Sequence, residues 1–127
     1  MMTGRVDFPS DVEVAIVSHN NLETLRATLH SVADAGCRPS AVIVVDVAST
    51  DGTGDYLAAE WPGVRVIRLV RNDGPSPGRN AGIRAATSRF VLLMDADVIL
   101  TPDATQQLHA AMVADARVKV GSPIVVH

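Results

Sequence analysis

The chain has 127 residues, of which 47% are hydrophobic, and its 11 basic and 14 acidic residues give a formal net charge of −3. This length and apolar content support one globular domain and exclude a disordered chain. The slight acidic excess, without any block of basic residues, argues against a nucleic-acid partner. We therefore predict a single domain over residues 1–127, with residues 1–10 as a polar tail.

Cysteine content and apolar run lengths indicate a cellular location. Cys37 is the only cysteine, so an intrachain disulfide is excluded. The longest apolar runs, at residues 42–45 and 90–94, are much shorter than a membrane span of roughly 18 residues. The first ten residues are too polar for a signal peptide. We expect a cytoplasmic protein without a transmembrane segment, either free or held at the cytoplasmic face of the membrane by partners.

Short apolar runs predict the strands. The runs at residues 12–18, 41–47, 63–70 and 89–95 are continuous rather than alternating, which is typical of buried strands in a parallel sheet covered by helices on both faces. A last strand is predicted at residues 117–126, and Pro123 places it at an edge of the sheet. An exposed edge strand offers a contact for a homo-oligomer.

Helical periodicity predicts four helices between and after these strands. The first has an apolar stripe, Asn20 as its N-cap, Glu23 to complete a capping box, and Gly36 at its end. The second covers residues 55–61, and the third runs from Ser76 to about Thr87. The fourth begins at Thr101 and Pro102, and its predicted inner face is Ala104, Leu108, Ala111 and Met112. The alternation predicts an α/β fold with a doubly wound, mainly parallel sheet.

In such a sheet, ligands bind at the carboxyl ends of the strands. Those ends are the loops at residues 18–20, 46–51, 71–79 and 95–97, which contain most of the residues capable of chemistry. Helix N-termini at the same edge attract phosphate, whereas Asp95 and Asp97 repel it unless a cation lies between. The combination predicts a nucleoside diphosphate with Mg²⁺ or Mn²⁺.

A stripe of small residues supports this prediction. Gly78, Ala81, Gly82 and Ala85 recur at helical spacing, and glycine inside a helix costs about 1 kcal/mol relative to alanine. The stripe indicates that the backbone of this helix approaches the sheet or a ligand closely.

Other interpretations of the same residues stay open. The pair of aspartates also suits a cap of the next helix, and Asp46 suits either a ligand contact or a loop-holding role. His19 suits a simple surface position. Arg79 suits either a phosphate contact or neutralisation of Asp95 or Asp97.

Several motifs in order resemble the family 2 glycosyltransferases, which have the nucleotide-diphospho-sugar transferase (GT-A) fold. The matching segments are VAIVSHN, VIVVDVASTDGT and GPSPGRNAGIRAATSRFVLLMDADV, and together they cover residues 12–98. The resemblance includes the spacing from Arg79 and Asn80 to the D-x-D triplet at Asp95.

The resemblance implies a site for a nucleoside diphosphate sugar and inverting transfer of the sugar to an acceptor hydroxyl, with a carboxylate as base. The acceptor, whether glycan, lipid or small molecule, is left open. Asp95 would face the ribose or the donor sugar, and Asp97, with Asp95, would hold Mn²⁺ or Mg²⁺ at the phosphates. The nucleoside site would comprise Ser18, His19, Asn20, Asp46 and Ser49.

Two departures from the family pattern matter. Val47 stands where many members carry a second acid that meets uracil, which leaves uridine, thymidine and guanosine donors open. Only 30 residues follow Asp97, so the chain resembles a donor-binding half that is truncated before the acceptor half, and we expect the catalytic base outside it.

Two alternatives follow from the same sequence. The first is a non-catalytic nucleotide-sugar-binding or interaction module, because no base motif is present. The second is a haloacid-dehalogenase-like phosphatase, whose D-x-D strand resembles VLLMDADVIL, although that strand opens the domain in the phosphatases and comes fourth here.

Overall fold

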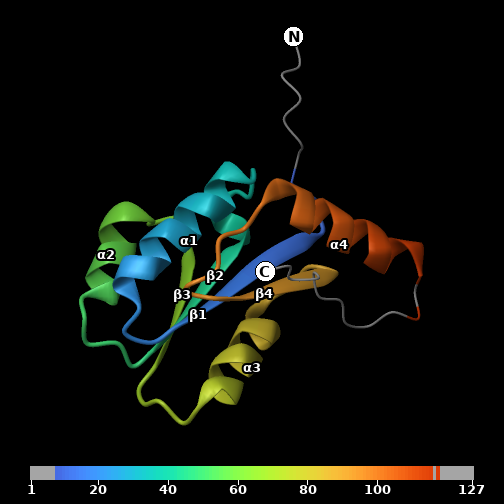
Figure 1. Ribbon diagram of the computed structural model, residues 1–127. Helices are drawn as coiled ribbons and strands as arrows, with labels where there is room; N and C mark the ends of the chain where they lie inside the picture. The colour runs from blue at the N-terminus through green and yellow to red at the C-terminus, as the bar shows by residue number, and fades with distance from the viewer. Residues whose placement is uncertain (1–7, 116, 118–127) are drawn as a thin grey trace, which may run out of the picture.

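The computed structural model describes residues 8–115 and 117, and Figure 1 shows a sheet with helices on both faces. The strands are β1 (Val12–Ser18), β2 (Val42–Val47), β3 (Arg65–Leu69) and β4 (Phe90–Asp95). The helices are α1 (Leu22–Asp34), α2 (Thr53–Glu60), α3 (Pro75–Ala85) and α4 (Pro102–Ala114), with a 3₁₀ turn, η1 (Pro39–Ala41), before β2. The predicted last strand, residues 117–126, and the homo-oligomer contact assigned to it lie outside the described residues except for Arg117.

The sheet of the described residues has the order β3-β2-β1-β4, and all its pairs are parallel. The central strands β1 and β2 are almost wholly buried, as their apolar runs predict. The prediction of buried strands is wrong for β3 and β4, whose side chains are largely half-buried or exposed. The reason is their position, because among the described strands each has a neighbour on one side only, and α3 packs mainly against β1 and β2.

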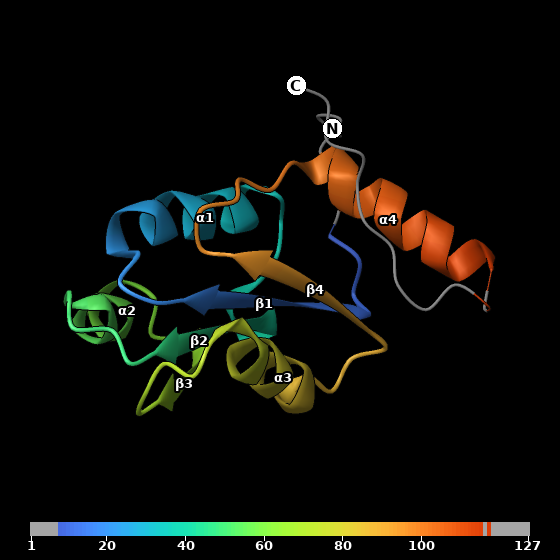
Figure 2. The same cartoon turned by 60° about the horizontal axis from the view of Figure 1, so that its bottom comes forward.

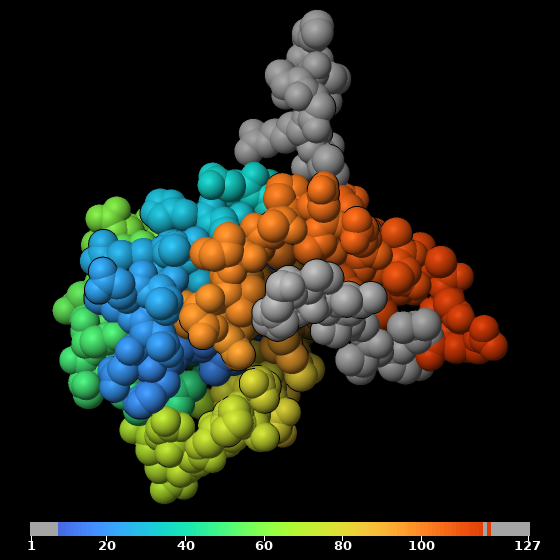
Figure 3. Space-filling model, in the orientation of Figure 1, coloured from blue at the N-terminus to red at the C-terminus, as the bar shows by residue number. Residues whose placement is uncertain are grey.

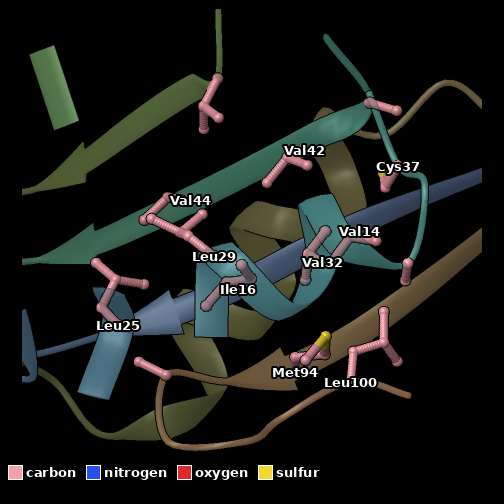
Figure 4. Close-up of a cluster of buried hydrophobic side chains, with 14 of the residues drawn as sticks. Val14, Ile16, Leu25, Leu29, Val32, Cys37, Val42, Val44, Met94 and Leu100 are labelled. Atoms are coloured by element: carbon pink, nitrogen blue, oxygen red, sulfur yellow. The ribbon is translucent and has the colours of Figure 1, made fainter. Parts of the chain in front are cut away.

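Two apolar clusters cover the two faces of the sheet. Figure 4 shows the larger cluster, in which Val14 and Ile16 of β1 pack against Leu25 and Leu29 of α1. The smaller cluster joins Ala15, Ile43, Val45 and Val47 to α3 on the opposite face. Figure 2 shows α1 above the sheet and α3 below it. Because both faces are covered, most successive residues of β1 and β2 are apolar, which explains the nearly continuous runs.

Helix α3 lies unusually close to the sheet, as the stripe of small residues predicts. A Cβ atom on Gly78 would lie 2.8 Å from Cγ1 of Val17 and 3.2 Å from Cγ2 of Val47. A Cβ atom on Gly82 would lie 3.0 Å from the Cβ atom of Ala15. The glycines therefore serve the approach to the sheet. The helix begins at Pro75, after Gly74 at φ 94°, and ends at Ala85, slightly earlier at both ends than predicted.

The start of α1 differs from the prediction. Its N-cap residue is Asn21, whose side chain makes no capping hydrogen bond, and Asn20 lies outside the helix at φ 50°. The carboxylate of Asp51 accepts the hydrogen bond of the Leu22 N–H group instead, at 3.0 Å. The cap is thus supplied by a loop that is distant in sequence, so a local capping box is the wrong prediction.

Helix α4 begins at Pro102 as predicted, and the hydroxyl of Thr101 accepts a hydrogen bond from the Ala104 N–H group at 3.3 Å. Its predicted inner face is only partly correct, because Ala111 is exposed and Thr105 is the buried residue. Figure 1 shows α4 beyond the β4 side of the sheet. His109 holds it there through a 2.7 Å hydrogen bond with Asp11 and an edge contact with the ring of Phe90.

A buried carboxylate ties the amino ends of the strands together. Glu13 of β1 accepts hydrogen bonds from the N–H groups of Thr87 at 2.7 Å and Ser88 at 2.6 Å. It also forms an ion pair with Arg65 of β3, whose guanidinium donates to the Ala85 carbonyl at 3.2 Å. These bonds fix the end of α3 and the start of β4 at the edge of the sheet opposite to the D-x-D triplet.

Gly78→Ala tests the close approach of α3. We expect the free energy of unfolding to fall by about 1–2 kcal/mol, because overpacking against Val17 outweighs a gain of about 1 kcal/mol in helix propensity. Urea unfolding followed by circular dichroism measures the change.

Gly54→Ala in α2 is the matched control, since a Cβ atom there has nothing within 4 Å. It should be neutral or stabilise by up to about 1 kcal/mol. Equal effects of the two substitutions would contradict the packing of α3 described here.

Candidate functional site

Strand register brings polar residues from three strands to one edge of the sheet. Ser18 of β1 is the Cα partner of Asp46 on β2, and Val17 is the partner of Asp95 on β4. Neighbouring strands lie about 4.8 Å apart, so the two aspartates flank the end of β1. The predicted convergence of these loops is therefore present in the structure.

Both carboxylate oxygens of Asp46 accept hydrogen bonds from neighbouring protein groups. The residue is 1% exposed, its Oδ1 atom accepts a hydrogen bond from the Ser49 N–H group at 3.1 Å, and its Oδ2 atom accepts one from Arg68 at 2.6 Å. Arg68 also donates to the Ser49 carbonyl at 3.1 Å. Of the two interpretations that the sequence leaves open, this geometry favours the loop-holding role. Arg68 was missed by the sequence analysis because nothing in β3 indicates its partner 22 residues earlier.

The ends of β1 and β2 are joined by hydrogen bonds. The Asn20 N–H group donates to Oγ of Ser49 at 2.9 Å, and the Thr50 N–H group donates to Oδ1 of Asn20 at 2.8 Å. The Nδ1 atom of His19 donates to the Val47 carbonyl. Asn20, at φ 50°, and Ala48, at φ 49°, have left-handed backbone conformations that few L-residues adopt. The two loops therefore form one hydrogen-bonded support.

Asp51 completes this support. It accepts hydrogen bonds from the hydroxyl and the N–H group of Thr53 as well as from Leu22. The hydroxyl of Thr53, followed by the backbone N–H groups, holds the pKa of the Asp51 carboxyl below its usual value of 3.8. The carboxylate therefore remains ionised at neutral pH, where it links the starts of α1 and α2.

Ser18 has an unusual environment. It is 1% exposed, and within the described residues its hydroxyl is buried without a hydrogen-bond partner. A buried hydroxyl without a partner costs on the order of 1–3 kcal/mol. This unmet hydrogen-bonding capacity at the end of β1 suits a residue that contacts a ligand.

Two side chains of α1 form hydrogen bonds to the D-x-D turn and the residues that follow it. Ala96 is buried, and its carbonyl accepts a hydrogen bond from the hydroxyl of Thr28 at 3.1 Å. Oγ of Ser31 accepts a second bond from the Leu100 N–H group at 2.9 Å. Figure 3 shows the segment after β4 packed against α1. The turn thus leaves Asp95 and Asp97 exposed to solvent on a fixed backbone.

Thr28 and Ser31 were missed by the sequence analysis. The signal was present for Thr28, which interrupts the apolar stripe of α1 between Leu25 and Leu29 and is completely buried. A polar residue at such a position needs a partner, although the sequence does not name that partner.

Arg79 lies beside the D-x-D turn. Its Nη2 atom is 3.6 Å from Oδ1 of Asp95, and both side chains are about half exposed. The two residues border a hollow of about 210 Å³, which is lined in addition by Val17, Leu93, Met94 and Val98. A guanidinium, a carboxylate and an apolar wall therefore meet at the carboxyl edge of the sheet.

The donor set fits a hard divalent cation that shares its ligands with a phosphate. Within the described residues, no group of three or more His, Cys, Asp or Glu side chains could hold a metal. At this edge, Asp95 and Asp97 are the exposed carboxylates of the D-x-D turn. Mg²⁺ or Mn²⁺ typically takes one or two carboxylates and completes its shell with phosphate and water. None of the described helices is long and apolar enough to cross a membrane.

Comparison with known proteins identifies relatives that match most of the chain. The family model described as Glycosyl transferase family 2 matches residues 13–126. The chain is 37% identical over 105 residues to the succinoglycan biosynthesis protein ExoO of Rhizobium meliloti, covering 81% of this chain and 30% of that protein. It is 38% identical over 103 residues to the undecaprenyl-phosphate mannosyltransferase of Micrococcus luteus, covering 76% of this chain and 42% of the relative. The chain therefore spans less than half the length of these relatives.

Solved structures share the fold. TarS of S. aureus, residues 1–349, in complex with UDP-GlcNAc aligns with a TM-score of 0.66 at 25% identity, over 82% of this chain and 31% of that chain. The mannosyltransferase PcManGT of Pyrobaculum calidifontis in complex with GDP-Man and Mn²⁺ aligns with a TM-score of 0.68 at 24% identity, over 80% of this chain and 32% of that chain. The described domain thus has the GT-A fold predicted from its sequence.

Arg68→Met tests the support beneath the site. We expect the free energy of unfolding to fall by about 2–3 kcal/mol, because the buried carboxylate of Asp46 loses its charged partner. Denaturant titration measures the loss. The control is Arg71→Met, since Arg71 pairs with Asp73 at 2.8 Å while their side chains are 79% and 54% exposed. It should change stability by less than about 0.5 kcal/mol, and equal losses would contradict the role of Arg68.

Proposed function

Because the chain belongs to glycosyl transferase family 2, we propose that it is the donor-binding domain of a glycosyltransferase and that it binds a nucleoside diphosphate sugar. The observation that carries the proposal is the register of β1 with its two neighbours, which puts Ser18, Asp46 and Asp95 at one edge of the sheet. Family membership removes the haloacid-dehalogenase-like alternative.

Each part of this edge has a proposed role. The support formed by His19, Asn20 and Ser49 holds the nucleoside, and the hydroxyl of Ser18 supplies a further hydrogen bond. Asp46 acts indirectly, through the loop that it fixes. Arg79 contacts the diphosphate, and Asp95 faces the ribose or donor sugar. The solved relatives hold UDP-GlcNAc in one case and GDP-Man in another, so the fold itself leaves the base open.

Asp97, together with Asp95, is proposed to hold Mn²⁺ or Mg²⁺. Such an ion neutralises the negative charge that develops on the diphosphate leaving group. The side chains of the D-x-D turn suit this role because they are exposed, while the backbone of the turn is anchored to α1 through Thr28.

Transfer also requires a base for the acceptor hydroxyl. We propose that residues beyond 1–127 supply this base and the acceptor site, since the chain spans 30% of the length of ExoO and 42% of the length of the mannosyltransferase. A nucleotide-sugar-binding module without transferase activity would share the donor site. Sugar transfer to an acceptor separates the two, because only the enzyme shows turnover.

Isothermal titration calorimetry tests donor binding. We expect UDP, GDP or TDP to bind in the presence of Mn²⁺ or Mg²⁺ and to bind at least about tenfold more weakly in EDTA, because charge-assisted contacts to the phosphates are lost. Asp97→Asn should remove most of this difference. Asp103→Asn, which changes an exposed aspartate of α4 by the same chemistry, should retain it. Equal affinity with metal and with EDTA would contradict the metal site, and absence of binding under every condition would contradict the function.

A further inference from the structure

The two carboxylates of the D-x-D turn differ in their partners. Oδ1 of Asp95 lies 3.6 Å from the guanidinium of Arg79, whereas within residues 8–115 Asp97 forms no ion pair and no side-chain hydrogen bond. We propose that Arg79 is a competing cation: it holds Asp95 when no donor is present and moves to the diphosphate when a donor binds. This inference rests on the proposed function and assigns a regulatory role to a residue of the same site.

The position of Arg79 is set by the packing of α3. Gly78, the preceding residue, lies against Val17, and Val17 is the Cα partner of Asp95 in the β1–β4 pair. The close approach that requires glycine at position 78 therefore puts the next side chain beside Asp95. The backbone arrangement of α3, β1 and β4 therefore places the two side chains of the ion pair next to each other.

The pair is suited to exchange because it is weak. The side chain of Arg79 is 48% exposed and that of Asp95 is 61% exposed, and the distance of 3.6 Å leaves only one contact. Exposed pairs of this kind contribute about 0.2–1 kcal/mol. The pair of Arg68 and Asp46 at the same edge is different, since Asp46 is 1% exposed and makes a second hydrogen bond.

Arg79 and a divalent cation exclude each other at Asp95. A guanidinium and a metal ion bound to the same carboxylate repel each other at short range. A diphosphate offers Arg79 a better partner, because a guanidinium donates paired hydrogen bonds to phosphate oxygens. The hollow of about 210 Å³ that Arg79 and Asp95 border leaves space for the guanidinium to turn away from the carboxylate.

The consequence is coupled binding. Without nucleotide, the metal can bind Asp97, but Arg79 occupies the carboxylate of Asp95. With a nucleoside diphosphate bound, both carboxylates are free to bind the metal, which also gains phosphate ligands. By linkage, the factor by which the nucleotide raises the affinity for the metal equals the factor by which the metal raises the affinity for the nucleotide. Arg79 thus weakens the binding of metal to the site before the donor arrives.

Binding of Mn²⁺ alone tests the competition. Electron paramagnetic resonance of free Mn²⁺ gives the dissociation constant without any nucleotide. We expect Arg79→Gln to bind Mn²⁺ about two- to fivefold more tightly than the wild type, which matches the strength of an exposed ion pair. Arg84→Gln removes an exposed arginine that lies five residues later in α3 and forms no ion pair in the described part, and it should bind Mn²⁺ as the wild type does. It therefore controls for the change in net charge.

The Asp95→Asn background tests the partner. There, Arg79→Gln should no longer change the affinity for Mn²⁺, because the competition at Asp95 is gone. A persistent gain in this background would show that Arg79 acts only through its general charge, and it would overturn the proposal.

Nucleotide titrations in EDTA test the second position of Arg79. The Arg79→Gln variant should bind the nucleoside diphosphate about tenfold more weakly than the wild type, because a charged hydrogen bond to the phosphate is lost. If Arg79→Gln leaves the affinity for Mn²⁺ alone unchanged while the wild type still binds nucleotide with metal, the exchange is wrong and the proposed function stands. If the wild type binds no nucleoside diphosphate under any condition, the proposed function is wrong and the exchange falls with it.

Discussion

Strand β1 lies hydrogen-bonded between β2 and β4, and this parallel pairing determines where the polar residues that follow these three strands lie. Parallel strands deliver their carboxyl ends to the same edge of a sheet, so the three loops that follow these strands meet around Ser18. The pairing in turn depends on burial of both faces of β1, by α1 on one side and by α3 on the other. Packing of the apolar core around β1 therefore also determines where the polar loops at the edge of the sheet lie.

Two ion pairs at this edge, Arg68–Asp46 and Arg79–Asp95, differ in how deeply their carboxylates are buried. The carboxylate of Asp46 is buried and held by Arg68 and by the Ser49 N–H group, so its release would leave an uncompensated charge in the core. The carboxylate of Asp95 is exposed and touches Arg79 through one long contact, so water can replace that partner at little cost. The first pair is suited to a fixed support, and the second is suited to a site whose occupants change.

The sequence predicts the fold class and the central strands because burial on both faces forces continuous apolar runs. It predicts the start of α4 because Thr101 and Pro102 are neighbours, and it predicts the close approach of α3 because glycine and alanine recur at helical spacing. The burial assigned to β3 and β4 is wrong, since a run of apolar residues does not reveal whether a strand has one neighbour or two.

Contacts between residues distant in sequence were beyond prediction. Asp51, rather than Asn20, caps α1 from a loop 29 residues away, and the hydroxyl of Thr28 reaches Ala96 across 68 residues. The sequence does indicate that polar residues gather at one edge, but which of them support the loops follows only from the folded chain. The ligand roles of Ser18, His19 and Asp97 remain predictions.

The most direct test of the account is the location of bound manganese in the folded domain. In a ¹H–¹⁵N NMR spectrum recorded with a nucleoside diphosphate, added Mn²⁺ should broaden the amide signals of Asn20, Ser49 and Asp97. The amides of Thr87 and Ser88, which bind Glu13 at the amino edge, should broaden far less, because a strand of six residues separates the two edges by about 20 Å. Broadening at Thr87 and Ser88 that equals or exceeds that at Asn20, Ser49 and Asp97 would contradict a donor and metal site at the carboxyl ends of β1, β2 and β4.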